Sequence, residues 1–196
     1  MAASAILVDL DGTVWDSIPW YALVLSGGDA VRAVDVELRL RQGESVIGIA
    51  RERGFTKTAF VQRCSQHLEE LRLFPTVRET LAVLDRRGVP MGIVTSLSGD
   101  LASAMLEGSR LGHHFQTIIH PGRCRSGKAS GVPLRRALNH LRIAPSAEVF
   151  YIGDREDDAA CARACGVSFA WASYGYGVRP PRGSTILRRF DEVLEL

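Results

Sequence analysis

The chain has 196 residues, 46% of them hydrophobic, which suits one core or one domain carrying a smaller insert. Its 24 basic and 22 acidic residues leave a formal net charge of +2, without the clustered basic excess that nucleic-acid or membrane partners usually require. No apolar run approaches the ~20 residues of a membrane span, and no signal peptide is recognisable, so we expect a cytoplasmic protein with neither kind of partner.

Five short apolar runs are predicted to be strands. Each run is continuous rather than alternating, which is typical of strands covered on both faces and therefore of a parallel sheet. In chain order the predicted strands are Ala5–Val8, Val89–Val94, Gln116–Ile119, Val149–Ile152 and Val167–Trp171.

Helical patterns separate the later strands. Apolar residues recur at helical spacing in three of these segments, and the fourth segment is rich in alanine. The predicted helices are Val77–Arg87, Asp100–Leu111, Pro133–Leu141 and Asp157–Cys165. Strands that alternate with helices indicate an α/β fold with a doubly wound, Rossmann-like parallel sheet.

The stretch from Asp16 to Phe74 departs from this alternation. It contains no run typical of a strand, and apolar residues between Phe60 and Leu71 recur at helical spacing. Glycines punctuate the stretch, so we expect about four short helices inserted after the first strand. The predicted organisation is a Rossmann-like core of residues 1–15 and 75–196 with a small α-helical cap at residues 16–74.

Polar side chains stand where the predicted strands end. Because the carboxyl ends of parallel strands share one edge of a sheet, we expect these side chains to meet there. They are Asp9 and Asp11 after the first strand, Thr95 and Ser96 after the second, and Asp154 after the fourth, with Lys128 in the loop before the preceding helix. Crowded carboxylates repel one another, and a divalent cation such as Mg²⁺ relieves that repulsion. A cation, a lysine and a hydroxyl around one point favour the binding of a phosphoryl group.

Four motifs carry a resemblance to a known family: DLDGTVWDS at residues 9–17, VTS at 94–96, Lys128, and GDREDD at 153–158. Together they resemble the haloacid dehalogenase (HAD) superfamily. The insert after the first motif resembles subfamily I, and the phosphoglycolate phosphatase-like branch is the most similar pattern. The resemblance covers nearly the whole chain and implies a Mg²⁺-dependent hydrolase of phosphorylated metabolites.

The resemblance also implies roles for the first motif and its metal. Asp9 would be the nucleophile that becomes an aspartyl phosphate, and Asp11 would protonate the leaving oxygen and later activate water. Gly12 would let the chain turn away at once. Asp9 and Asp154 would ligate Mg²⁺ through carboxylate oxygens, and Asp11 would add its backbone carbonyl.

The other motifs imply supporting contacts. Thr95, with Ser96 beside it, would hydrogen-bond a phosphate oxygen. Lys128 would neutralise the nucleophile and the phosphoryl oxygens, and Asp158 would orient Lys128 or a metal-bound water.

Several positions keep two interpretations. Ala129-Ser130-Gly131 follows Lys128 where the family usually has prolines, so two alternatives to this lysine remain: Arg123 or Arg125, or a loop that lies purely at the surface. Some residues either approach the substrate or belong to the surface or the packing: Arg155, Asp157, Arg51, Arg53, Lys57, Trp15, Trp20 and Tyr21. We expect His113 and His114 to be surface or capping residues. We expect the four cysteines, Cys64, Cys124, Cys161 and Cys165, to be small buried side chains in a reducing compartment.

The leading hypothesis is a Mg²⁺-dependent phosphatase that hydrolyses a small-metabolite phosphomonoester through an aspartyl phosphate. Dehalogenases and phosphonatases of the family lack the second acid, so the presence of Asp11 disfavours those chemistries. A sugar phosphomutase of the same fold would need the same residues and is an alternative. A non-catalytic phosphometabolite-binding protein is a third hypothesis. Substrate choice is expected to lie in the cap.

Overall fold

The computed structural model describes residues 3–122 and 126–196. Within these ranges the main sheet has six parallel strands in the order β5-β4-β1-β6-β7-β8. They are β1 (Ala5–Val8), β4 (Met91–Val94), β5 (Thr117–Ile119), β6 (Val149–Gly153), β7 (Ser168–Ala172) and β8 (Thr185–Leu187). The first strand lies between β4 and β6, so the residues that follow it stand in the middle of the sheet edge.

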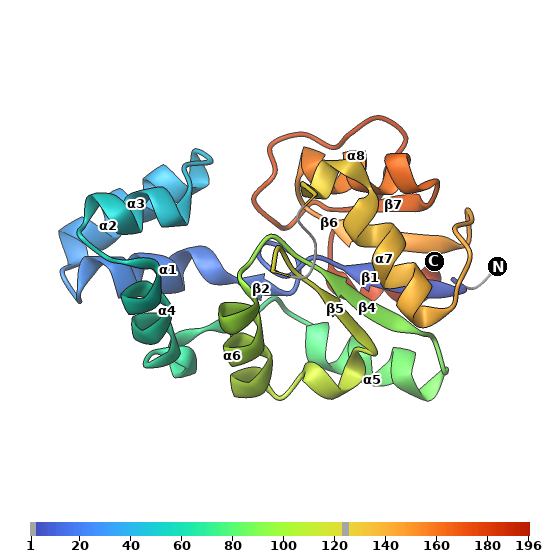
Figure 1. The fold of residues 1–196 in the computed structure, drawn as a ribbon, viewed down its shortest axis with the longest axis horizontal. Helices are drawn as coiled ribbons and strands as arrows, with labels where there is room; N and C mark the ends of the chain where they lie inside the picture. The colour runs from blue at the N-terminus through green and yellow to red at the C-terminus, as the bar shows by residue number, and fades with distance from the viewer. Residues whose placement is uncertain (1–2, 123–125) are drawn as a thin grey trace.

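Helices cover both faces of this sheet (Figure 1). Ile6 and Val8 of β1 belong to one apolar cluster, with side chains of α5 (Val77–Arg86) and α6 (Gly99–Ser109). Ala5 and Leu7 point the other way, into a second cluster with α7 (Val132–Leu141) and α8 (Glu156–Cys165). Burial on both faces explains the continuous apolar runs and confirms the doubly wound α/β fold.

The predicted bounds of β5, β6 and β7 are off by one residue at one or both ends, and two larger differences in the sheet have physical reasons. The strand expected from Val89 begins at Met91, after Pro90, which has no N–H to offer the ladder. The edge strand β8 was not predicted, because its three residues are too few to form a recognisable pattern and two of them are exposed.

Four helices lie between β1 and the rest of the sheet in sequence, and Figure 1 shows them together beyond one end of the sheet. They are α1 (Ser17–Ser26), α2 (Ala30–Arg41), α3 (Val46–Glu52) and α4 (Lys57–Ser65). The expectation that this stretch holds no strand was wrong. A short antiparallel pair forms where the chain enters and leaves these helices: β2 (Trp15–Asp16) precedes them, β3 (Arg72–Leu73) follows them, and the two strands are paired. Strands of two residues carry no periodicity from which they could be predicted.

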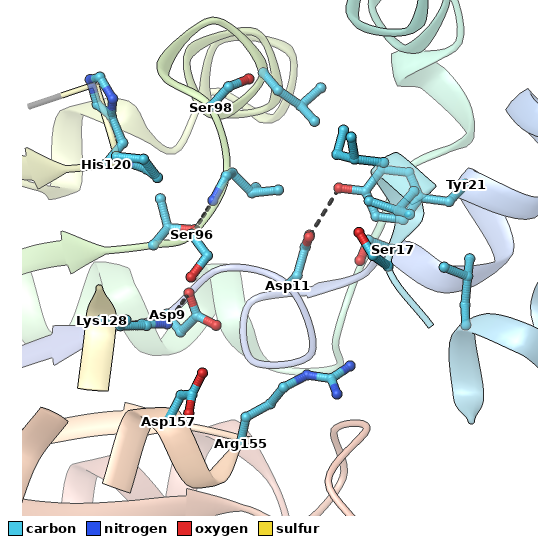
Figure 2. A pocket seen from close by; sticks show the side chains of 18 of the residues that line it. Asp9, Asp11, Ser17, Tyr21, Ser96, Ser98, His120, Lys128, Arg155 and Asp157 are labelled. Atoms are coloured by element: carbon cyan, nitrogen blue, oxygen red, sulfur yellow. Dashed lines mark hydrogen bonds and ion pairs between the residues drawn. The ribbon is translucent and has the colours of Figure 1, made fainter. Parts of the chain in front are cut away.

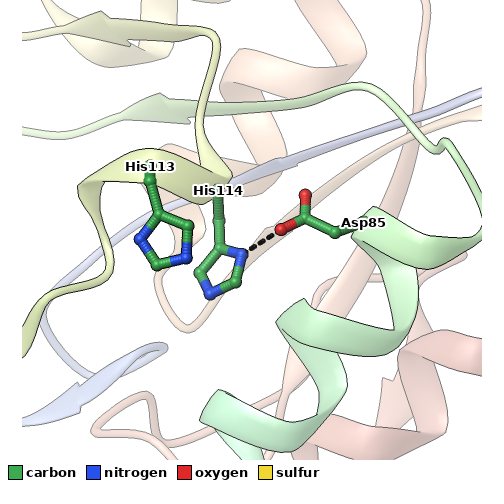
Figure 3. A group of neighbouring side chains, drawn as sticks. All are labelled: Asp85, His113 and His114. Atoms are coloured by element: carbon green, nitrogen blue, oxygen red, sulfur yellow. Dashed lines mark hydrogen bonds and ion pairs between the residues drawn. The ribbon is translucent and has the colours of Figure 1, made fainter.

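The expectation for the adjacent histidines was wrong for His114. This side chain is buried, and its Nδ1 pairs with Asp85 Oδ2 of α5 (Figure 3). The pair ties the 3₁₀ turn Gly112–His114 to α5. His113 is exposed, and its ring centroid lies 4.0 Å from that of His114. Local sequence did not reveal the burial, because the partner lies 29 residues away.

Three cysteines, Cys64, Cys161 and Cys165, are buried free thiols, as expected. Cys124 lies outside the described residues. Among residues 3–122 and 126–196, no helix has both the length and the apolar content needed to cross a bilayer.

Candidate active site

The structure brings the strand-end residues together at one edge of the sheet. They border a cavity of about 760 Å³ that side chains of the four inserted helices complete on its other side (Figure 2). The predicted site residues that line it are Asp9, Asp11, Thr95, Ser96, Lys128 and Asp158. Asp154 follows β6 and is fully buried.

Lys128 lies between two carboxylates. Its Nζ is 2.8 Å from Asp9 Oδ1 and 2.5 Å from Asp158 Oδ1, and its side chain is only 9% exposed. Burial alone would lower the pKa of Lys128, but the charges of Asp158 and Asp9 outweigh burial and hold the pKa above the ordinary lysine value. The lysine is therefore a fixed positive charge beside Asp9.

Asp158 is held from three sides. Besides the ion pair with Lys128, its Oδ2 accepts a hydrogen bond from the backbone N–H of Arg155 at 3.0 Å. The hydroxyl of Tyr151 lies 3.1 Å from Asp158 Oδ1. With both oxygens engaged, Asp158 is arranged to position Lys128.

The donor set fits a divalent cation. Asp9, Asp154 and Asp158 each offer a carboxylate oxygen, and these oxygens lie within 4.8 Å of one another. Asp154 Oδ2 accepts a hydrogen bond from the Tyr176 N–H at 2.8 Å, but Asp154 Oδ1 is buried and has no hydrogen-bond partner among the described residues. A buried carboxylate oxygen without a partner is costly, and a hard cation would satisfy it.

Without a cation, burial raises the pKa of three carboxyl groups at this site, Asp154, Asp11 and Asp9. Burial, followed by the charges of Asp9 and Asp158, raises the pKa of Asp154 to about 7. Burial, followed by the charge of Asp9, raises the pKa of Asp11 to about 6. Burial also raises the pKa of Asp9, although Lys128 opposes the shift.

These shifts predict how the stability of the metal-free protein depends on pH. The folded state keeps the Asp154 proton up to about pH 7, whereas the unfolded chain releases it near the ordinary aspartate pKa of 3.8. The free energy of unfolding should therefore fall as pH rises through this window, and it should fall less in an Asp154→Asn variant. Urea unfolding in EDTA at several pH values measures both slopes. The exposed Asp157→Asn is the control, and equal slopes in Asp154→Asn and wild type would contradict the prediction.

Asp11 faces the inserted helices. Its Oδ2 accepts a hydrogen bond from the Tyr21 hydroxyl of α1 at 2.9 Å, and its Oδ1 is buried without a hydrogen-bond partner in the described part of the chain. Figure 2 shows this carboxylate turned toward Tyr21 and Ser17. Tyr21 therefore lines the cavity, whereas Trp15 and Trp20 are packed in the core.

Gly12 is required for two reasons. Its φ is +78°, in the left-handed region that favours glycine. A Cβ at this position would also overlap with Asp154 Oδ2. The chain can therefore turn sharply after Asp11 and still pass close to Asp154.

Thr95 is buried at the end of β4. Its backbone N–H donates to the Ile119 carbonyl at 3.0 Å, and its Oγ1 accepts from the Leu97 N–H at 3.2 Å. The hydroxyl proton is thus available to the cavity that Thr95 borders.

Tyr176 was not singled out from the sequence. Its backbone N–H holds Asp154, and its hydroxyl lies 3.0 Å from the Ile18 N–H and 3.1 Å from Asp16 Oδ1. A Cβ on Gly175 would overlap with the Gly12 carbonyl, and one on Gly177 would overlap with the Asp154 carbonyl. The alternating YGYG of residues 174–177 was the available signal, because glycines beside an aromatic mark close backbone approach.

The structure also places the residues that the sequence left open. Arg155, Asp157 and Lys57 line the cavity. Arg53 instead pairs with Asp35 at 3.2 Å, and Arg51 does not line the cavity. Arg123 and Arg125, the alternatives to Lys128, lie outside the described residues.

Comparisons with known proteins point to one family. The family model for haloacid dehalogenase-like hydrolases matches residues 6–172. A phosphoglycolate phosphatase of Chromobacterium violaceum is 30% identical over 88% of this chain and 86% of that relative. A phosphoglycolate phosphatase of Rhodospirillum rubrum is 26% identical over 98% of this chain and 88% of its own.

Solved structures share the fold. A HAD-superfamily hydrolase of subfamily IA from Geobacter sulfurreducens has a TM-score of 0.71 at 20% identity, with 99% of each chain covered. CbbY from Rhodobacter sphaeroides, in complex with phosphate, has a TM-score of 0.73 at 18% identity, covering 99% of this chain and 100% of its own.

Proposed function

The chain belongs to the haloacid dehalogenase-like hydrolase family, and on that premise we propose that it is a Mg²⁺-dependent phosphatase acting on a small-metabolite phosphomonoester through an aspartyl phosphate at Asp9. The main support is the geometry at Asp9. This carboxylate borders the cavity beside a fixed lysine charge at 2.8 Å and close to Asp154, whose Oδ1 is buried without a hydrogen-bond partner among the described residues.

In the first step, a carboxylate oxygen of Asp9 forms a bond to phosphorus while the bond from phosphorus to the ester oxygen breaks. Asp11 gives its proton to the departing oxygen, which leaves as the alcohol. The raised pKa of Asp11, about 6, suits a group that must hold a proton near neutral pH. Lys128 and the Thr95 hydroxyl stabilise the charge on the phosphoryl oxygens.

In the second step, water attacks phosphorus and gives a proton to Asp11. The bond between phosphorus and Asp9 then breaks, which releases inorganic phosphate and restores the Asp9 carboxylate and the protonated Asp11. Asp158 keeps Lys128 beside Asp9 throughout, through the 2.5 Å ion pair. Asp9, Asp154 and the Asp11 carbonyl would hold Mg²⁺, and the ion would neutralise charge on the phosphoryl oxygens.

We assign residues 16–74 as a cap that covers this site. The hydrogen bond from Tyr21 to Asp11 couples α1 directly to the proposed acid. The hydroxyl of Tyr176 contacts the start of the same helix at Ile18, while its backbone holds Asp154. A displacement of α1 would therefore shift both Asp11, the proposed acid, and Asp154, a proposed metal ligand.

Release of inorganic phosphate tests the proposal. Purified protein with Mg²⁺ should hydrolyse p-nitrophenyl phosphate and at least one member of a panel of sugar, nucleotide and glycolyl phosphates, and excess EDTA should abolish turnover. A hexose 1-phosphate converted to the 6-phosphate without phosphate release would identify a mutase instead. Binding of Mg²⁺ and inorganic phosphate with no turnover of any ester would indicate a non-catalytic protein.

A further inference from the structure

Five of the eleven cap residues that border the cavity have aliphatic side chains. Each of the four cap helices contributes at least one of these aliphatic side chains. These side chains, which together form an aliphatic wall on the cap side of the cavity, are Ile18 of α1, Leu40 of α2, Val46 and Ile47 of α3, and Val61 of α4. An apolar wall built from four separate helices favours a ligand with apolar surface of its own.

One positive charge stands in this wall. Lys57 is the first residue of α4, and among the described cap residues that border the cavity it is the one with a cationic side chain. Its ammonium group has no ion pair or hydrogen bond with the described residues. The acidic lining residue Glu44 is already paired with Arg39, at 2.6 Å. The cap wall therefore offers an uncompensated cation next to aliphatic side chains.

The cavity is large for a two-carbon alcohol. Its volume of about 760 Å³ falls in the range that holds ligands of many heavy atoms, whereas glycolate offers one methylene between its hydroxyl and its carboxylate. With the phosphoryl group held at Asp9, so short an alcohol would leave most of the aliphatic wall facing water.

We infer that the natural leaving group is an alcohol larger than glycolate, with an apolar body against this wall and an anionic group near Lys57. The inference rests on the proposed phosphatase function and specifies its substrate class. The reaction is unchanged: the phosphorus–oxygen ester bond breaks, water supplies the oxygen of inorganic phosphate, and the alcohol leaves with the proton from Asp11. Ester size and charge then determine kcat/KM through contacts with the cap.

A homologous series of substrates tests the apolar body. The series consists of phosphomonoesters of ω-hydroxy carboxylic acids of increasing chain length, with phosphoglycolate as the shortest member. The value of kcat/KM should rise by about fourfold for each added methylene until the wall is covered. Alkyl phosphates of matched length without the carboxylate form the parallel series that tests the anionic group.

Two pairs of variants assign the effects to residues. Ile47→Ser should lower kcat/KM for the longer esters about three- to tenfold and leave phosphoglycolate nearly unchanged, while the control Leu38→Ser, on an exposed part of α2 outside the cavity, should change neither. Lys57→Gln should lower kcat/KM by about two- to fivefold, and only for carboxylated esters, because an exposed ion pair is weak. Arg51→Gln, an exposed cap arginine outside the cavity, is its control.

The outcomes separate the inference from the function on which it rests. Hydrolysis that is fastest with phosphoglycolate, or equal losses for all esters in Ile47→Ser and Lys57→Gln, would refute the substrate class and leave the phosphatase assignment standing. A lack of hydrolysis of every ester, p-nitrophenyl phosphate included, would refute the phosphatase function and the inference with it.

Discussion

Replacing Asp9 with asparagine is expected to reduce kcat about 10³-fold or more, because the amide cannot form the bond to phosphorus that the carboxylate forms. The substitution conserves size, and Lys128 keeps its ion pair with Asp158, so the fold should persist. Phosphate release from p-nitrophenyl phosphate with Mg²⁺ gives the rate. Mass spectrometry of quenched reactions should detect a phosphoryl adduct in the wild type and none in the variant.

The control for this variant is Asp29→Asn. Asp29 caps the N-terminus of α2 by accepting from the Arg32 N–H, and asparagine caps helices equally well, so activity and stability should both be retained. An Asp9→Asn enzyme as active as the wild type would show that another group attacks phosphorus. Urea unfolding of the variant distinguishes a lost nucleophile from a lost fold.

Replacing Lys128 with methionine is expected to impair both activity and stability. The variant leaves Asp9 and Asp158 close together, each buried and without the cation that lies 2.8 and 2.5 Å from them. Removing one partner of a buried ion pair typically costs about 3–5 kcal/mol of stability. Loss of the charge beside the phosphoryl group should lower kcat by about 10²- to 10³-fold.

Two measurements check this double effect. Urea unfolding in EDTA should show a free energy of unfolding lower by several kcal/mol in Lys128→Met, whereas Lys57→Met, at an exposed position without a described partner, should change stability little. A double variant Lys128→Met with Asp158→Asn should recover part of the stability, because one of the two unpaired carboxylates is gone. A Lys128→Met protein with unchanged stability and kcat would place the functional cation elsewhere.

The large elements of the fold were predictable because their burial leaves a pattern. The run Ala5–Val8 is apolar throughout, since two of its residues face each helical layer, and the structure has a strand with the same bounds. The amphipathic segment from Val77 became α5. The pair β2 with β3 was missed because two residues carry no periodicity, and the burial of His114 was missed because it depends on the distant Asp85.

The candidate site was predictable to a smaller extent. Asp9, Thr95 and Asp154 could be named because each directly follows an apolar strand, and parallel strands end at a common edge. Tyr21 and Tyr176 could not be assigned in the same way. Their contacts with Asp11 and Asp154 depend on how α1 and a late loop lie against the first motif.

Local residue patterns were enough to predict the layered α/β core and the acids at its strand ends, because burial on both faces of a strand and apolar residues at helical spacing are visible in short stretches of sequence. Which groups touch could be learned from the three-dimensional structure alone: Lys128 lies between Asp9 and Asp158, Tyr21 donates to Asp11, and aliphatic side chains of residues 16–74 line the same cavity. Such contacts join residues far apart in the chain, so the packing of whole elements sets the distance between their atoms and no local preference does.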